Sequence, residues 1–252
     1  MPHRDEPWPD GVPCWADLSV PDVPAAQRFY SAVLGWEWPA AADQDPQYGG
    51  YLLATVDGRA AAGLGPAQDP SQPHAWTVYL ATSDVDATAQ RVTGAGGQVV
   101  AGPFDVGPMG RMAIAVDPQG SSFGMWQAGQ HQGAEVYGAP GALVWEDLGL
   151  ADPAAGQRFY TEVFGWQWQD LEGMAEYQTF TTGDDPLGGA GPVEAVGAPG
   201  WQLCFGCRAT DAVVAAATEA GGQLVTGPED TPYGRFAALT DPWGARFSVM
   251  SL

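Results

Sequence analysis

Two aspartates in the same local context are the residues of this sequence with the clearest potential for chemistry. Asp17 lies in the stretch Trp15-Ala-Asp-Leu, and Asp147 lies in Trp145-Glu-Asp-Leu, 130 residues further along the chain. Alternate side chains of a strand point to the same side, so each aspartate should share one sheet face with the tryptophan two residues before it. A carboxylate in such an apolar setting could have a raised pKa and act as a general base, or it could stay charged and receive a ligand cation.

Each aspartate also has a structural alternative. It could pair with an arginine, or it could accept a hydrogen bond from a backbone or indole N–H. Arg111 and Arg235 are the natural partners, because they occupy matching places before a predicted terminal hairpin. The same two arginines could equally lie at the rim of a binding site. Asp17 and Asp147 are therefore candidate catalytic residues, and Arg111 and Arg235 are candidate ligand-binding residues.

Histidines and cysteines offer little further chemistry. His3, His74 and His131 lie in the N-terminal lead, a predicted loop and a predicted linker, so no Ser/His/Asp arrangement can be assembled. Cys204 and Cys207 have the spacing of a redox or metal motif, but they lie along a predicted strand, where residues three apart point to opposite faces. We interpret them as structural thiols.

The elements that carry these residues occur twice. After each Trp-x-Asp strand, Asp22 or Asp152 can cap a helix, and Gly35 or Gly165 can take the left-handed conformation that ends it. The apolar residues of the first helix recur at i and i+4, which predicts one buried stripe. The stripe contains Phe29, Tyr30, Val33 and Leu34.

The same pattern extends over longer modules. We predict a β-α-β-β module followed by a β-α-β-β-β module, and the second half of the chain replays both. The first half should contain hairpin strands 48–55 and 59–64 turned at Asp57-Gly58, a strand at 75–82, a helix opened by Asp84, a strand at 98–100, a loop at 102–110, and a final hairpin of 111–116 and 121–126 turned at Asp117-Pro-Gln-Gly120.

Length and charge limit the possible functions. The 252 residues suit two domains, which we place at 11–128 and 141–252, with a linker at 129–140. The net charge of −21 arises from 30 acidic and nine basic residues, which disfavours binding to nucleic acids or anionic membranes. No long apolar run or signal-type N-terminus is visible, and the three cysteines form no even set, so we expect a cytoplasmic protein.

Several of these motifs resemble the vicinal oxygen chelate superfamily, which includes glyoxalase I, bleomycin-resistance proteins and extradiol dioxygenases. They are Asp22…Phe29-Tyr30…Leu34-Gly35-Trp36, Asp84-Val-Asp86…Gly96-Gly97 and Asp117-Pro-Gln-Gly120. The resemblance covers nearly all of residues 13–250 and implies an α+β fold of tandem glyoxalase-like domains. Each domain would contain two βαβββ modules that form an open eight-stranded cup, with helices outside and the ligand inside.

In that family, metal ligands project from the first and last strands of each module. The resemblance transfers these sites to Trp15, Thr77 and Gly124, to Trp145, Gln202 and Ser248, and to positions near Gly63 or Gly65 and Gly189 or Ala190. These positions supply one amide and no imidazole or carboxylate, whereas a divalent metal needs several such ligands. We therefore expect neither a metal nor another cofactor.

The residues that replace the ligands predict an aromatic lining. Tryptophan at both first-strand positions suits a flat organic ligand, or alternatively fills a collapsed cup as core. The candidate ligand-binding residues are Trp15, Thr77, Tyr79, Arg111, Trp126, Trp145, Gln202, Cys204, Arg235 and Ser248. Because Tyr79 and Trp126 add stacking surface, while Cys204 and Met250 take the matching places in the second domain, we expect the first cup to bind such a ligand more tightly.

Three functions remain open. The first is metal-free binding of a hydrophobic, aromatic and possibly cationic metabolite or antibiotic, as in sequestration or resistance. The second is a cofactor-independent lyase, isomerase or cyclase of secondary metabolism that uses Asp17 or Asp147 as general base. The third is a metal-dependent enzyme of the glyoxalase or dioxygenase type. Because a tandem chain carries both domain copies in one molecule, we expect a monomer.

Overall fold

The computed structural model describes residues 3–40, 46–69, 74–171, 173–174 and 176–252. Its elements follow the predicted repeat, with extra short helices after β11 and before β2. The first half contains β1 (Pro13–Val20), α1 (Val23–Leu34), η2 (Pro46–Tyr48), β2 (Leu52–Val56), β3 (Arg59–Pro66), β4 (Trp76–Ala81), α2 (Val85–Gly94), β5 (Gln98–Asp105), β6 (Gly110–Val116) and β7 (Ser122–Ala128). The second half contains β8 (Leu143–Leu150), α3 (Pro153–Phe164), β9 (Gln167–Asp170), β10 (Gln178–Thr181), β11 (Gly188–Pro192), α4 (Val193–Val196), β12 (Gly200–Cys207), α5 (Thr210–Glu219), β13 (Gln223–Thr231), β14 (Gly234–Thr240) and β15 (Arg246–Ser251).

Each half forms one open sheet, which confirms the α+β class and the tandem arrangement. The strand order is β2-β3-β1-β4-β7-β6-β5 in the first sheet and β13-β14-β15-β12-β8-β11-β10-β9 in the second. The first strands of the two modules, β1 and β4 or β8 and β12, are antiparallel neighbours at the centre of each sheet. Each also pairs in parallel with the last strand of its own module.

Two details of the strand prediction were wrong. The first sheet has seven strands among the described residues instead of eight, because the place of β9 is taken by a single bridge between Glu37 and Thr55. The expected loop at 102–110 begins later, since β5 continues to Asp105 through register irregularities in its pairing with β6. The hairpin turn at Asp57-Gly58 is confirmed, with positive φ at both residues.

The helix ends form as predicted. Asp22 Oδ1 accepts a hydrogen bond from the Ala25 N–H at 2.9 Å, and Asp152 Oδ1 does the same for Ala155 at 3.0 Å. Gly35 follows α1 with φ of 74°, a left-handed conformation that side chains disfavour.

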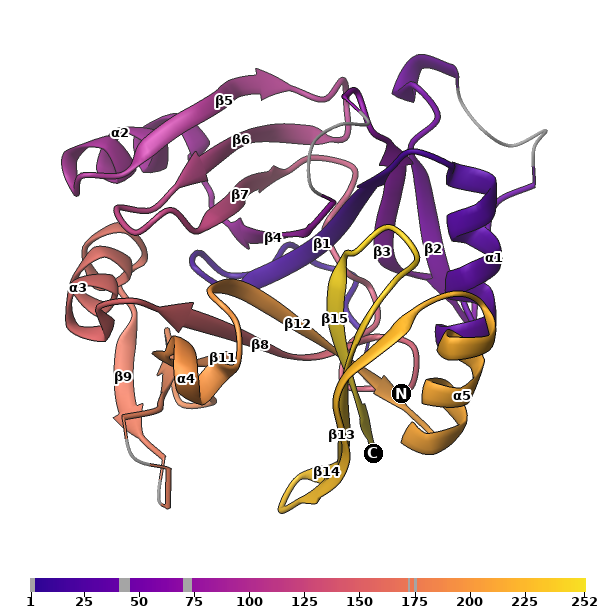
Figure 1. Cartoon of the computed structure of the whole chain (residues 1–252). Helices are drawn as coiled ribbons and strands as arrows, with labels where there is room; N and C mark the ends of the chain where they lie inside the picture. The colour runs from indigo at the N-terminus through magenta and orange to yellow at the C-terminus, as the bar shows by residue number, and fades with distance from the viewer. Residues whose placement is uncertain (1–2, 41–45, 70–73, 172, 175) are drawn as a thin grey trace.

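The helices of the two domains meet in one core. Helix α1 packs against α5 and α2 packs against α3, each pair joining one helix from each domain (Figure 1). The face of β1 that carries Ala16, Leu18 and Val20 lies in the same cluster as Phe205 and Phe247 of the second domain. The opposite face of each sheet carries Trp15 and Asp17 in the N-terminal domain, where we call it the first cup, and Trp145 and Asp147 in the C-terminal domain, where we call it the second cup.

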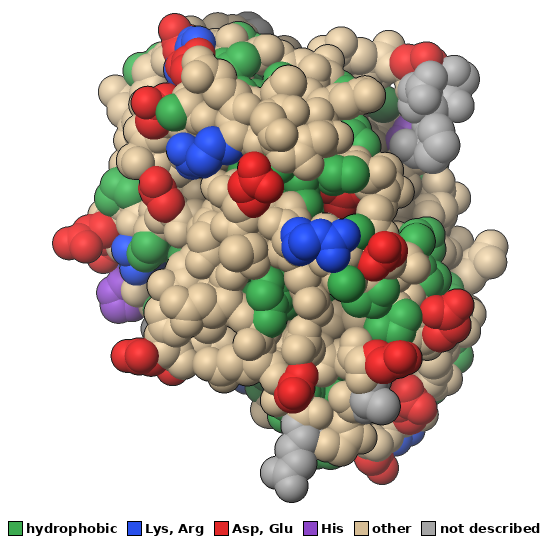
Figure 2. All heavy atoms as spheres, turned by 90° about the vertical axis from the view of Figure 1, so that its left-hand side faces the viewer, with side chains coloured by type: hydrophobic (Ala, Val, Ile, Leu, Met, Phe, Trp, Pro, Cys, Tyr) green, Lys and Arg blue, Asp and Glu red, His purple; other side chains and the backbone are tan. Residues whose placement is uncertain are grey.

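Acidic side chains lie scattered over the surface. The face on the side of α2 and α3 shows many separate Asp and Glu side chains and few arginines (Figure 2). No helix of the described chain is long and apolar enough to cross a membrane.

Candidate functional site

The first cup brings the predicted residues of β1 and β4 together. Strand register places Trp15 opposite Tyr79, and Asp17 opposite both Thr77 and Gly63. Tyr79 is in turn opposite Gly124 of β7. Directly paired residues carry their side chains on the same face, so these positions share the inner face as expected.

Asp17 is the centre of a hydrogen-bond network in this cup. Its Oδ2 accepts hydrogen bonds from the Tyr79 hydroxyl at 3.0 Å and from the Tyr51 hydroxyl at 3.2 Å. The Trp15 indole Nε1–H donates to the Tyr51 oxygen at 2.8 Å. Burial raises the pKa of Asp17 to about 6, against the opposing effect of the two tyrosine hydrogen bonds. The carboxyl is thus mostly ionised at neutral pH and held by fixed donors.

Tyr51 was missed by the sequence reasoning. It crosses over Gly63 and Gly65 of β3, and a Cβ added at Gly63 would lie 1.8 Å from the Tyr51 hydroxyl oxygen. A glycine is required there because the tyrosine fills the space. The signal was available in the repeat, since Tyr51 and Gly63 recur as Tyr177 and Gly189 at one common offset.

The second cup repeats this arrangement. The Tyr177 hydroxyl donates to Asp147 Oδ1, and the Trp145 indole N–H lies 3.0 Å from the Tyr177 oxygen and 3.1 Å from Asp147 Oδ1. Burial raises the pKa of Asp147 to about 6, partly offset by those two donors. A Cβ at Gly189 would lie 1.7 Å from the Tyr177 hydroxyl oxygen. Both cups therefore hold an Asp–Tyr–Trp triad.

The walls of the two cups differ in size. Cys204 of the second cup pairs with Trp145 and Ser248, as Tyr79 of the first cup pairs with Trp15 and Gly124. The substitutions from first to second cup are Tyr79 to Cys204, Ile114 to Ala238, Trp126 to Met250, Gly124 to Ser248 and Met112 to Phe236, as the matching strand pairs show. Three side chains become smaller and two become larger. Besides Trp145, the second cup is lined by the aromatic side chains of Phe236 and Tyr177.

The linker closes the first cup. The backbone N–H groups of Gly129 and His131 donate to the Met109 carbonyl, and the Ala134 N–H donates to the Cys14 carbonyl. The His131 ring packs edge-on to Trp15, with ring centroids 4.5 Å apart, and to Trp126, whose Nε1–H donates to the His131 carbonyl at 2.9 Å. Burial lowers the pKa of His131 to about 4. The histidine that the sequence places in a linker is thus part of the first cup.

Exposure of the two tryptophans follows from this closure. Trp15 is only 4% exposed, whereas Trp145 is partly exposed, and among the described residues no aromatic ring packs against the Trp145 ring, although the Tyr177 hydroxyl accepts its N–H. The stacking surface of Trp15, on which the expected preference for the first cup was based, is thus covered by the protein itself, and the preference stays a prediction.

The two arginines do not reach the aspartates of the cups. Arg111 forms ion pairs with Asp86 and Asp105, each at 2.9 Å. Arg235 forms the equivalent pairs with Asp211 at 2.6 Å and with Asp230 at 3.0 Å. The suggested pairing with Asp17 and Asp147 was wrong, because each arginine is held by carboxylates of its own neighbouring helix and strand.

Gln202 and Cys207, two of the remaining residues of β12 singled out in the sequence, form hydrogen bonds with residues close to them in the chain. The Gln202 amide donates to the carbonyls of Pro199 at 3.1 Å and Trp201 at 2.9 Å. Cys204 is buried on the cup face with its pKa raised, mainly by burial, so its thiol is unreactive at neutral pH. Cys207 contacts the Thr210 hydroxyl at 3.5 Å.

The residues at the ligand positions of the family do not fit a divalent metal. Indole, hydroxyl and glycine occupy most of these places, and the Tyr51 hydroxyl fills the space beside Gly63. Within the described part of the chain, no group of three or more His, Cys, Asp and Glu side chains could hold a metal ion. Among the residues that the structure describes, oxygen and nitrogen donors in the number that zinc, iron or manganese requires do not converge in either cup.

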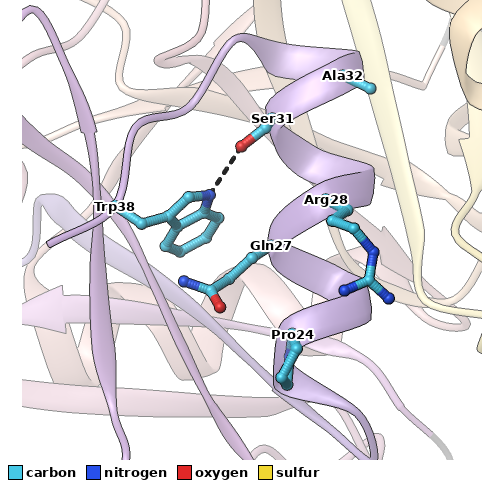
Figure 3. A pocket seen from close by; sticks show the side chains of 6 residues that line it. All are labelled: Pro24, Gln27, Arg28, Ser31, Ala32 and Trp38. Atoms are coloured by element: carbon cyan, nitrogen blue, oxygen red, sulfur yellow. Dashed lines mark hydrogen bonds between the residues drawn. The ribbon is translucent and has the colours of Figure 1, made fainter. Parts of the chain in front are cut away.

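Two surface depressions lie outside the cups, on equivalent helix faces. The first is lined by Pro24, Gln27, Arg28, Ser31, Ala32 and Trp38 of and near α1 (Figure 3), and the second by Ala154, Gln157, Arg158, Thr161 and Glu162 of α3. In the first, the Trp38 indole N–H donates to the Ser31 hydroxyl at 2.9 Å. Neither contains an acid–base pair next to a reactive side chain, so the candidate chemistry lies in the cups.

The sequence of the chain matches two domain families. Residues 14–125 match the Glyoxalase/Bleomycin resistance protein/Dioxygenase superfamily, and residues 144–250 match the Glyoxalase-like domain. The Mycobacterium tuberculosis protein named "Putative glyoxylase CFP32" is 38% identical over 99% of this chain and 98% of its own length. Anthracycline biosynthesis protein DnrV of Streptomyces peucetius is 39% identical over 96% of this chain and 94% of its own.

Solved structures agree on the fold. The Mn(II)-bound glyoxalase of Novosphingobium aromaticivorans superposes with a TM-score of 0.67 at 18% identity, covering 96% of this chain and 83% of that one. At this identity the likeness concerns the fold alone. Together with the two open sheets and the two family matches, these relatives show that the chain belongs to the Glyoxalase/Bleomycin resistance protein/Dioxygenase superfamily.

Proposed function

We propose that this protein binds a flat aromatic metabolite in a cup of its glyoxalase-type fold without using a metal ion. The observation that carries the proposal is the Asp–Tyr–Trp triad, which occupies each cup where the family resemblance would place metal ligands. Indole and phenol rings offer stacking surface, and the carboxylate offers one strong acceptor for a polar group of the ligand.

The relatives point to a class of ligand. Two proteins that align along nearly the whole chain, DnrV of Streptomyces peucetius and DauV of Streptomyces sp. strain C5, are named anthracycline biosynthesis proteins. Anthracyclines contain a planar, hydroxylated anthraquinone, which suits an indole-lined cup. The acidic surface, with a net charge of −21, also favours neutral or cationic ligands over anionic ones.

Titration with 2,6-dihydroxyanthraquinone tests this function. We expect micromolar binding, seen as quenching of tryptophan fluorescence and confirmed by calorimetry, in buffer that contains a chelator. The ligand should be recovered unchanged by chromatography. Binding that disappears on chelation and returns with added Mn(II) or Zn(II), or no binding at all, would contradict the proposal.

A metal-independent enzyme is the second candidate, and one observation favours it. Asp17 and Asp147 have pKa values raised to about 6, close to what a general base working near neutral pH requires. Such an enzyme would abstract a proton from a ring or side-chain carbon next to a carbonyl. Exchange of ligand protons for deuterium, followed by NMR and lost in Asp147→Asn, would favour catalysis over simple binding.

A further inference from the structure

The first cup already contains a phenol of its own. The Tyr79 hydroxyl donates to Asp17 Oδ2 at 3.0 Å, and its ring lies against Gly124, where an added Cβ would come within 2.1 Å of a ring carbon. Tyr79 is 6% exposed. The His131 ring also packs against Trp15. In the first cup, groups of the chain itself therefore cover the Trp15 ring and donate to the Asp17 carboxylate.

The second cup lacks this internal phenol. Cys204 takes the place of Tyr79, so Asp147 keeps its partners Tyr177 and Trp145 but has no counterpart to the Tyr79 hydroxyl. Both donors are directed to Oδ1, and no described group donates to Oδ2. Asp147 is partly exposed, so the free oxygen is open to an incoming donor.

The wall residues of the second cup leave space for an aromatic ring in the place that the Tyr79 ring fills in the first cup. Replacing Tyr79 by Cys204 removes a phenol, and Ala238 and Met250 stand where the first cup has Ile114 and Trp126. Ser248 in place of Gly124 adds one hydroxymethyl group at the base, which keeps a ring from lying as deep as that of Tyr79 does. Trp145 and Phe236 remain as aromatic walls.

Together these observations point to a specific ligand group. We infer that the second cup binds a phenolic ring whose hydroxyl donates to Asp147 Oδ2, in the place that Tyr79 fills in the first cup. This inference rests on the proposed function and deepens it, since it names the binding cup and the polar group that is recognised. A hydrogen bond from a neutral phenol to a carboxylate is charge-assisted and therefore stronger than one between neutral groups.

Two matched ligands test the recognition of the hydroxyl. 2-Naphthol and 2-methoxynaphthalene have the same ring system, but only 2-naphthol can donate. At pH 8 we expect 2-naphthol to bind about tenfold or more tightly to the natural protein, and this preference to shrink to about twofold in Asp147→Asn. Equal binding of the two compounds, or a preference that persists in Asp147→Asn, would overturn the inference even if the anthraquinone binds.

A second experiment restores the internal phenol. Cys204→Tyr should weaken 2-naphthol binding at least tenfold, because the new ring occupies the ligand's place, whereas Cys204→Ser should change it by less than about twofold. Tyr79→Cys, the reverse change in the first cup, should not weaken binding of 2-naphthol to the second cup. Unchanged binding in Cys204→Tyr, or a large loss in Tyr79→Cys, would overturn the inference. Should Cys204→Tyr fail to fold, as its melting curve would show, the ligand pair and Asp147→Asn decide by themselves.

Discussion

Glu146 is a buried carboxyl that lies next to the candidate residue Asp147 but on the opposite face of β8. It is 7% exposed, and no described group donates a hydrogen bond to its side chain. Burial, with a smaller effect from the charge of Asp147, raises its pKa to about 8. The equivalent position of the first domain is Ala16, so the repeat itself shows that the fold does not need a carboxyl there.

We predict that Glu146→Gln stabilises the protein increasingly as pH rises above about 4.5, with the full gain reached above about pH 8. Since the pKa is higher in the folded than in the unfolded state, the folded protein binds more protons between about pH 4.5 and pH 8, and its stability falls as pH rises through that range. The glutamine cannot ionise. The unfolding free energy of the variant minus that of the natural protein should therefore be about 1–4 kcal/mol larger at pH 9 than at pH 5.

Urea unfolding at pH 5 and pH 9 measures the difference. Glu162→Gln, on the outside of α3, is the matched control and should leave the pH dependence unchanged. A variant as sensitive to pH as the natural protein would show that Glu146 is not the group responsible.

His131 has the opposite pH dependence. Its Nε2 is buried with no partner among the described residues, and its pKa is lowered to about 4, so the folded state holds the neutral ring. Below about pH 6.5 the unfolded chain binds the proton first, and stability is lost as pH falls towards 4. Protonation should therefore favour release of the linker from Trp15 and Trp126.

Replacement by phenylalanine tests this role. His131→Phe keeps an aromatic ring against Trp15 but cannot be protonated, so between pH 7 and pH 4.5 it should lose about 1–3 kcal/mol less stability than the natural protein. His3→Phe, at an exposed position, serves as control. Identical pH profiles for His131→Phe and the natural protein would refute the role of this ring.

At the scale of the elements, the Asp-Pro turns connect the two domains. The Tyr30 hydroxyl of α1 donates to Asp241 Oδ2 of the second domain at 3.0 Å, and the Tyr160 hydroxyl of α3 donates to Asp117 Oδ2 of the first at 3.1 Å. The Asp117 carboxylate also accepts the backbone N–H groups of Gln119 and Ser121, which shapes the turn between β6 and β7. Each turn thus binds a helix of the other domain.

We predict that Tyr160→Phe and Tyr30→Phe each destabilise the protein. Both changes leave a buried carboxylate with one donor fewer, which costs about 1–3 kcal/mol. The tyrosines are equivalent by repeat, so the two losses should be similar, and the double variant should unfold in a less cooperative transition. Thermal unfolding followed by circular dichroism measures both. A loss below about 0.5 kcal/mol in each variant would show that the hydrogen bonds contribute little.

At the scale of the whole molecule, the two domains cover each other's helix faces. Besides the tyrosine bonds, the Trp36 indole donates to the Gly141 carbonyl at 2.7 Å and the Trp166 indole donates to the Gly11 carbonyl at 2.8 Å. The apolar residues of α1 and α3 are buried in one cluster shared by both domains. A second chain is not needed to complete this core.

The full chain should therefore be a monomer. Light scattering at micromolar concentration should give the mass of one chain, 26.4 kDa. The first domain expressed alone would expose Phe29 and Tyr30, and we expect it to dimerise or aggregate. A stable dimer of the full chain would contradict the prediction.

Metal content is also a property of the whole molecule. Protein treated briefly with a chelator should contain well below one equivalent of manganese, iron, nickel or zinc and keep its melting temperature, because the cups offer too few ligands. Elemental analysis together with calorimetry measures both quantities. Stoichiometric metal, or a melting temperature that falls on chelation, would show that a site of another composition exists.

The sequence by itself determined the repeat, the helices and most strands, because these depend on local signals. Aspartate caps, glycine ends, the Asp-Gly turn and period-2 alternation are all encoded within a few residues. Alternation also placed Trp15 and Asp17 on one face, since side-chain direction along a strand follows from spacing alone.

Only the tertiary structure decided what meets across the cups and between the domains. Tyr51 reaches Asp17, His131 covers Trp15, and Arg111 pairs with Asp86 through contacts between segments far apart in the chain. Strand alternation gives the face of a residue but not its neighbours from other strands, loops or the linker. The covering of Trp15 and the partial exposure of Trp145 follow from those long-range contacts, so the stacking surface that remains accessible in each cup could not be derived from the sequence alone.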